Sequence, residues 1–352
     1  MNPLNELLQA RLLKGPVPAA EVMALGLYHA EHGYYRRLEG PWGFDGKDYY
    51  TALDLGPLLG QTLALRLEAA WEQLGRPATF TALEPGAGRG WLGRDLLNAV
   101  SGPFADALVY VHRDDNPAAK RAAQAALLPF LKANRARFAH ETDPVEPFTG
   151  AVFSNELFDA LPAQPWRWDG AQWTREVLTA AGPEWQAADA GEAGAWFAAQ
   201  SDGLEPRDGS VWCEALPGLV HDLAAPLEAG LFLAVDYGES ADRLLAKGAD
   251  LRRFKAHSVD GQWHEDLGEA DLTADVDFTR LATLLEGEGL AELGHQELSK
   301  WIRTHAPLDQ WGAQWMALPD AERKARSENL LQLTLPNMLG SRFRVLEGWK
   351  GA

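Results

Sequence analysis

The residues best suited to chemistry in this chain form a glycine-rich segment at 81–90, which reads TALEPGAGRG. A short run of β-type residues leads into Glu84, and Gly86, Gly88 and Gly90 follow at alternate positions. The stretch that comes next, WLGRDLLNAV, has the pattern of a helix. A strand, a glycine turn and a helix in this order are typical of a loop that binds a nucleotide-type cofactor. Glycine lets such a backbone turn tightly and lets a ligand approach it closely.

The spacing of these glycines distinguishes between cofactors. A dinucleotide loop of the GxGxxG type needs its third glycine at position 91, where this chain has Trp91. The carboxylate of Glu84 would repel a pyrophosphate, whereas it suits S-adenosylmethionine (SAM), which carries an amino group and a sulfonium. From this loop alone, SAM is as good an interpretation as a structural turn or another nucleotide.

Two acidic residues, Asp114 and Asp115, follow a second expected strand at 107–112. A carboxylate at this point of such a fold accepts hydrogen bonds from the two ribose hydroxyls of a cofactor. The alternative is an ordinary helix start, in which Asp115 or Asn116 caps the helix that begins at Pro117. The two interpretations are compatible, with Asp114 on the ribose and a neighbour at the cap.

Residues 155–162 (NELFDALP) follow an expected strand at 150–154, so we expect them to face the reactive end of a cofactor. The Asn155 amide can hold a substrate nitrogen, and the Glu156 carboxylate can hold a cationic group and accept its proton. The alternative is a capped helix, with Asn155 as N-cap and Glu156 and Asp159 near its positive end. We favour the functional interpretation, because it is unusual for an apolar strand to aim such a pair at a crevice.

Tyr237 follows a later, strongly apolar strand at 230–235. It is a candidate for the wall of a substrate pocket, and a plain strand end is the equal alternative. The sequence shows no cluster of His, Asp or Glu with metal-ligand spacing, no GxSxG motif and no Walker lysine. We therefore expect no metal site.

Strand and helix patterns alternate from residue 80 onward, which predicts a doubly wound α/β sheet with its ligand at the carboxyl ends of the strands. The expected domains are an N-terminal helical cap at 1–76 and a main α/β domain at 77–352. Within the second, the hairpin signal Asp169-Gly170 predicts an inserted β-structure at about 163–210. A C-terminal helical extension is expected to follow, with FRVLEGW as a terminal edge strand.

The composition limits the class of function. The chain has 352 residues, with 32 Lys and Arg against 50 Asp and Glu, which gives a net charge of −18. That balance argues against nucleic acid as a substrate and would favour a basic protein partner at long range, although the better interpretation is that the acidity only confers solubility. The single cysteine, Cys213, excludes an intramolecular disulfide and a cysteine-based zinc site, and it fits a reducing cytoplasm. We find no secretory signal and no membrane-length apolar run, and therefore expect a cytoplasmic protein.

These motifs together resemble those of the MidA-type SAM-dependent methyltransferases, nearly from end to end of the chain. The most specific match is NELFDALP, which is close to the family's NEFFDALP, and the glycine segment is similar to ExGPGRGTLxxDLL. Further matching segments, in chain order, are VPAAEVMALGLYHAEHGYY at 17–35, YTALD at 50–54, DDNPAAKRAAQ at 114–124, VDYG at 235–238, DLTADVDF at 271–278 and MLGSRFRVL at 338–346.

The resemblance implies a class I methyltransferase fold, SAM as the cofactor and an arginine of a partner protein as the methyl acceptor. Mitochondrial members of the family methylate an arginine of a respiratory complex I subunit during assembly. The residues expected to bind SAM are Glu84 (amino group), Gly86, Gly88 and Gly90 (methionine part), Asp114 (ribose) and Asp143 (adenine amine, or else a loop acid). The residues expected to hold the acceptor guanidinium are Glu156, with Asn155, Asp54 and Tyr237 in support and His257 as an outside candidate.

Four positions depart from the family pattern. Asp54 and Gln61 stand where the family usually has Glu, Leu53 where it has Pro, and Asp275 where it has His. These departures concern the substrate more than the cofactor. The open alternatives are a non-catalytic SAM-binding assembly factor, a small-molecule methyltransferase and a nicotinamide-dependent oxidoreductase, against which the missing glycine at position 91 argues.

Overall fold

The computed structural model describes residues 2–36, 52–256 and 258–351. The chain divides into two compact units, each built from three separate segments. The first unit comprises Met1–Tyr49, Phe158–Gly218 and Tyr237–Leu281, and the second comprises Tyr50–Leu157, Leu219–Asp236 and Ala282–Ala352. The predicted domain boundary at residue 76 stays a prediction.

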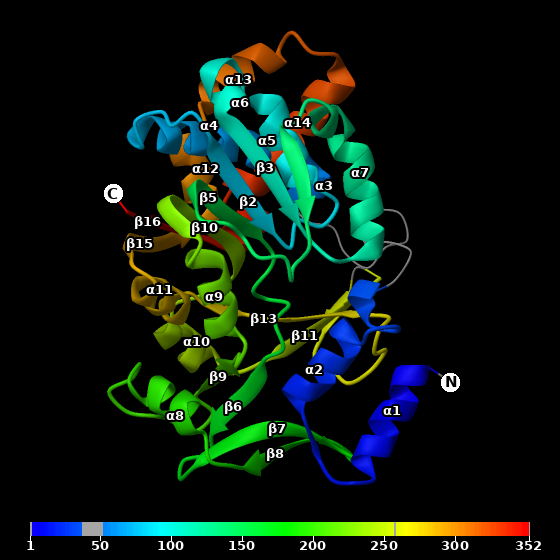
Figure 1. The fold of residues 1–352 in the computed structure, drawn as a ribbon. Coiled ribbons are helices and arrows are strands. Elements are labelled where there is room, and N and C mark those ends of the chain that lie inside the picture. The colour runs from blue at the N-terminus through cyan, green and yellow to red at the C-terminus, as the bar shows by residue number, and fades with distance from the viewer. Residues whose placement is uncertain (1, 37–51, 257, 352) are drawn as a thin grey trace. The chain divides into compact units, whose positions relative to one another are not determined.

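The second unit contains a mainly parallel central sheet (Figure 1). Its strand order is β15-β16-β10-β5-β2-β3-β4, in which β10, β5, β2, β3 and β4 pair in parallel and β15 and β16 pair antiparallel. The strands are β2 (Phe80–Pro85), β3 (Leu108–Arg113), β4 (Ala136–Ala139), β5 (Phe148–Asn155), β10 (Leu227–Glu239), β15 (Leu290–Glu297) and β16 (Phe343–Lys350). This arrangement confirms the predicted doubly wound α/β class.

The inner strands form because their residues can be buried on both faces. β2, β5 and β10 are near-continuous runs of buried apolar residues, as parallel strands covered by helices require. Helix α5 packs between α4 and α7 beside this sheet (Figure 1). The helices of this unit are α3 (Ala52–Leu55), α4 (Leu58–Gln73), α5 (Trp91–Ala99), α6 (Gly102–Ala107), α7 (Pro117–Lys132), α12 (Leu298–His305), α13 (Leu308–Trp315), α14 (Asp320–Thr334) and α15 (Leu339–Arg342).

The last strand corrects one sequence prediction. FRVLEGW does form a strand, β16, but this strand lies between β10 and β15 and is not an edge. The edge strand β15 escaped prediction because only Leu290 of its residues is buried, so that it shows no apolar alternation.

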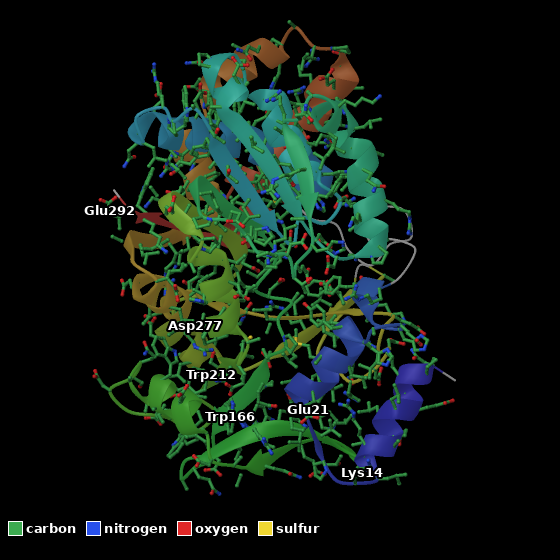
Figure 2. The ribbon with its side chains drawn as sticks, viewed as in Figure 1. Lys14, Glu21, Trp166, Trp212, Asp277 and Glu292 are labelled. Atoms are coloured by element: carbon green, nitrogen blue, oxygen red, sulfur yellow. The ribbon has the colours of Figure 1, made fainter. Side chains whose placement is uncertain are left out.

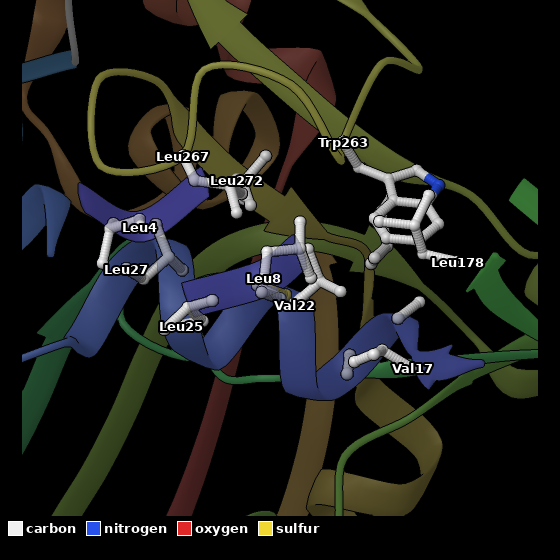
Figure 3. Packing of buried hydrophobic residues seen from close by; sticks show 14 of the residues in the cluster. Leu4, Leu8, Val17, Val22, Leu25, Leu27, Leu178, Trp263, Leu267 and Leu272 are labelled. Carbon is white, nitrogen blue, oxygen red and sulfur yellow. The ribbon is translucent and has the colours of Figure 1, made fainter. Parts of the chain in front are cut away.

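The first unit has its own apolar core, which joins segments far apart in the sequence (Figure 3). Asn2 caps helix α1 (Pro3–Leu12), whose Leu4 and Leu8 face α2 (Ala19–Tyr28). Trp263 and Leu267, which come from the last segment of this unit, belong to the same buried cluster. The short elements η1 (Tyr34–Arg36) and β1 (Val17–Pro18) flank α2.

The inserted β-structure of this unit is confirmed, with the predicted turn. β6 and β7 pair antiparallel around Asp169 and Gly170, and Gly170 has a φ of 104°. Trp166 and Trp212, labelled in Figure 2, lie in one buried aromatic cluster. The insertion contains β6 (Gln164–Trp168), β7 (Trp173–Thr179), β8 (Gly182–Ala187), the unpredicted helix α8 (Gly191–Ala198) and β9 (Gly209–Trp212).

Further elements complete the described chain. α9 (Leu216–Ala224) and α11 (Phe278–Gly287) each run from one unit's segment into the other's. Residues 251–274 contain a small antiparallel sheet, in which β11 pairs with β12 and with β13. Its elements and their neighbours are α10 (Ala241–Lys247), β11 (Leu251–Lys255), β12 (Ser258–Asp260), β13 (Asp271–Ala274) and β14 (Val276–Asp277).

Candidate active site

The glycine loop joins the carboxyl end of β2 to the start of α5 in the second unit. Gly86, Gly88 and Gly90 have φ values of 61°, 52° and 67°, a left-handed conformation that side chains with a Cβ rarely adopt. A Cβ at Gly86 would lie 2.8 Å from the Leu157 side chain, and one at Gly90 would lie 3.0 Å from Leu127. At Gly88 the nearest atom of a described residue would be 4.0 Å away, so no described side chain crowds the backbone there.

Asp114 lies beside this loop and hydrogen-bonds it. Its carboxylate accepts from the Gly88 N–H at 2.7 Å and from the Asn116 N–H at 2.6 Å. Burial raises the pKa of Asp114, although these two donors oppose the shift. The cap of helix α7 is Asn116, whose side chain accepts from the backbone of Ala118 and Ala119. The helix-start interpretation is therefore right for Asn116, and it leaves Asp114 available to the loop.

Glu84 lies beneath the loop. It is only 3% exposed, and the Tyr110 hydroxyl donates to its carboxyl group at 2.6 Å. Burial raises the pKa of Glu84 to about 8, so it carries a proton at neutral pH. A Cβ at Gly93 would lie only 2.2 Å from the Tyr110 ring, so it is the glycine that allows α5 to pack this closely against Tyr110. The predicted contact of Glu84 with an amino group stays a prediction.

Asp54, in α3, is paired with an arginine of the glycine loop. Both carboxylate oxygens accept from the Arg89 guanidinium at 2.9 Å, and the Asp54 side chain is 3% exposed. Arg89 also stacks over the Trp91 ring at 3.8 Å from its centroid. The sequence did not predict this pair, which joins α3 to the loop, and the catalytic role expected of Asp54 stays a prediction.

Asn155 and Glu156 come together at the carboxyl end of β5. The Asn155 amide donates to the Glu156 carboxylate at 2.8 Å. Glu156 has a φ of 54°, and its N–H donates to Val235 O at 2.9 Å. The next N–H, that of Leu157, donates to the Asp236 carboxylate at 3.1 Å. Residues 156–162 contain no helix, so the capped-helix alternative was wrong. The pair instead lies where β5 ends, in a turn that the hydrogen bonds of these two N–H groups fix to the end of β10.

Two other predicted site residues have plain structural contacts. Asp143 closes a turn, because its carboxylate accepts from the His140 N–H at 2.7 Å. Tyr237 belongs to the first unit, where the Arg252 guanidinium lies 5.9 Å from its ring centroid. The roles predicted for both stay predictions, and His257 lies outside the described residues.

Asp275, which departs from the family pattern, belongs to a charged cluster of the first unit. It accepts from Arg252 at 2.5 Å and from Lys247. These two cations outweigh its burial and lower the pKa of Asp275. Burial of Asp159 in the same cluster raises its pKa to about 7, against the opposing effect of Arg252. The acid at position 275 is thus neutralised within the chain.

The described residues show neither a metal site nor a membrane span. Among them, His, Cys, Asp and Glu side chains form no group of three or more that could hold a metal ion. In that same part of the chain, none of the helices combines the length and apolar character needed to cross a membrane.

The strand order and the glycine loop define a class I SAM-dependent methyltransferase fold. A family model described as "Putative S-adenosyl-L-methionine-dependent methyltransferase" matches residues 62–296. The chain belongs to this family, which confirms the predicted methyltransferase class and SAM as its cofactor. The nicotinamide alternative is left without support.

Curated relatives agree with this assignment, and a solved structure has the same fold. The mitochondrial protein arginine methyltransferase NDUFAF7 homolog of Drosophila melanogaster is 27% identical, over 99% of this chain and 85% of the relative. Human NDUFAF7 is 25% identical, over 97% and 83%. A COG1565 superfamily protein from Burkholderia thailandensis, bound to S-adenosylhomocysteine, has a TM-score of 0.85 at 23% identity, covering 99% of this chain and 92% of that one.

The residues present fit SAM. At Gly88 a ligand can approach the backbone of the loop without meeting a side chain of the described residues. The Asp114 carboxylate has about four acceptor sites and uses two of them for Gly88 and Asn116, which leaves capacity for two ribose hydroxyls. The sequence missed His112 and Tyr110, although each is a polar residue within an otherwise apolar strand.

Proposed function

We propose that this protein transfers the methyl group of SAM to a nitrogen of an arginine side chain in a partner protein. The Drosophila and human relatives support this proposal, because both are named protein arginine methyltransferases. The family resemblance further implies a subunit of a respiratory complex as the partner. The cytoplasm is the proposed location, which the single free cysteine, Cys213, supports.

The observation that carries the proposal is that two loops meet at the carboxyl ends of neighbouring strands. β2 and β5 are parallel neighbours, so the glycine loop and the Asn155–Glu156 pair leave the sheet at the same end. Leu157 lies directly against Gly86, where an added Cβ would be only 2.8 Å away. The cofactor loop is therefore adjacent to an amide and a carboxylate that can bind a guanidinium.

The chemistry needs positioning and one proton acceptor. Bound SAM supplies a methyl group on a sulfonium, and that carbon–sulfur bond breaks as the carbon–nitrogen bond forms. We assign Glu156 to bind the guanidinium and to take up the proton that the methylated nitrogen releases. The Asn155 amide holds the Glu156 carboxylate at 2.8 Å, so its direction is fixed before the substrate arrives.

The test is transfer of label from methyl-labelled SAM into a cell extract. We compare the wild type with Glu156→Gln and with Glu146→Gln, an exposed acid of the same unit, as the control. We expect a labelled protein band that contains methylarginine by mass spectrometry. The band should weaken about 100-fold in Glu156→Gln at unchanged SAM affinity, and Glu146→Gln should match the wild type.

Other outcomes select the alternatives. SAM binding without label in any fraction would indicate a non-catalytic assembly factor. Label confined to the low-molecular-mass fraction would indicate a small-molecule methyltransferase. Full activity of Glu156→Gln would remove Glu156 from its role.

A further inference from the structure

We propose that His112 is a positioning residue, which with Asp114 holds the backbone N–H and C=O of Gly88 and so presets the loop that receives the cofactor. The proposal depends on the cofactor and not on the methyl acceptor. His112 is the penultimate residue of strand β3, at whose end Asp114 also stands. Side chains two apart on an extended chain point to the same face, so both can reach the same neighbour.

The two contacts hold Gly88 from both sides. His112 Nε2 lies 2.9 Å from Gly88 O, and the Asp114 carboxylate accepts from the Gly88 N–H at 2.7 Å. His112 is fully buried and Asp114 is 8% exposed, so water competes little for either bond. Both backbone groups of this left-handed glycine are thereby tied to the end of one strand, and no side chain of the described residues lies within 4 Å of a Cβ built on it.

The tautomer of His112 follows from its surroundings. The other ring nitrogen, Nδ1, is buried and makes no hydrogen bond to another described residue. Burial lowers the pKa of His112, against the opposing effects of the Gly88 carbonyl and Asp114 and with a smaller contribution from Lys120. A neutral ring with one proton therefore carries it on Nε2, where Gly88 O accepts it.

The simpler interpretation is a core histidine that only fills space. Its ring does pack edge-on against Phe138 at 4.9 Å. Packing alone, however, would be served by an apolar residue, which would spare the chain a buried polar nitrogen. The bond to Gly88 gives the polar ring a specific use.

The test compares two amides that differ by one methylene. In His112→Gln the amide nitrogen reaches the position of Nε2 and can still donate to Gly88 O. In His112→Asn it reaches only the position of Nδ1, so the carbonyl loses its donor. Phe138→Leu is the packing control, because it disturbs the ring of His112 without removing the clamp.

SAM dissociation constants by calorimetry and melting temperatures are measured for each. We expect SAM binding to weaken about tenfold in His112→Asn and to stay within about threefold of the wild type in His112→Gln and Phe138→Leu. Equal losses of affinity in the Gln and Asn variants would overturn the proposal. So would a His112→Asn variant that melts earlier yet binds SAM like the wild type. If His112→Asn does not fold, the apolar variant His112→Leu takes its place. A tenfold loss of SAM affinity in His112→Leu with retained affinity in His112→Gln supports the proposal, and equal losses in the two overturn it.

Discussion

At the scale of single residues, Glu84 has a consequence that can be measured without a substrate. Its pKa is about 8 in the folded chain and about 4.5 in the unfolded one, so the folded state binds the extra proton between these values. Stability is therefore highest below pH 4.5 as far as this group is concerned, and it falls as the pH rises toward 8. The fall amounts to roughly 1.4 kcal/mol per pH unit within that window.

We predict that Glu84→Gln removes this fall, because an amide cannot lose the proton. The variant should be less sensitive to pH between about 5 and 8 and should exceed the wild type in stability above pH 8, by urea unfolding at several pH values. The exposed Glu228→Gln on β10 serves as the control and should keep the wild-type pH slope. An unchanged slope in Glu84→Gln would show that the carboxyl group is already ionised at neutral pH.

The Asp54–Arg89 pair gives a second prediction at this scale. Both side chains are largely buried, and removing either one takes two hydrogen bonds away from the buried charge of the other. Asp54→Asn and Arg89→Gln should each lower the free energy of unfolding by about 2–4 kcal/mol, and the double variant should lose clearly less than their sum. Strictly additive losses would mean that the two side chains act independently.

At the scale of elements, the glycine loop and the turn after β5 depend on each other. Gly86→Ala and Gly88→Ala should each lower the free energy of unfolding by about 1–2 kcal/mol, because each places an alanine in a left-handed conformation. Only Gly86→Ala also collides with Leu157, so it should destabilise the chain more in thermal unfolding. Adding Leu157→Ala should recover part of the difference for Gly86→Ala and none for Gly88→Ala. The same recovery in both would place the strain elsewhere.

The sequence could predict elements whose signal is local. β2, the glycine loop and α5 follow one another within about twenty residues. The hairpin of β6 and β7 is likewise marked by the turn residues Asp169 and Gly170 themselves. β15 could not be found, because it is held by pairing with β16 and not by an apolar pattern of its own. The Asp54–Arg89 pair could not be found either, because nothing in the sequence indicates that two residues thirty-five positions apart would meet.

At the scale of the whole molecule, the net charge of −18 should act on any basic partner from a distance. We predict that kcat/KM for a basic arginine-containing peptide falls as the salt concentration rises from about 0.05 M to about 0.5 M, since screening shortens the reach of the field. The dissociation constant for SAM should change much less over the same range. A rate that is indifferent to salt would confine recognition to close contacts.

The interior place of β16 also sets a delay during synthesis. This strand completes the sheet between β10 and β15, yet it leaves the ribosome only after about 100 further residues have followed β10. At typical elongation rates, roughly 5 to 20 s pass before β10 can pair with β16, and β15 lacks its partner strand for roughly 2 to 9 s of that interval. Unpaired strand edges invite association with other chains, so we expect nascent copies of this protein to aggregate less when a chaperone is present during that interval.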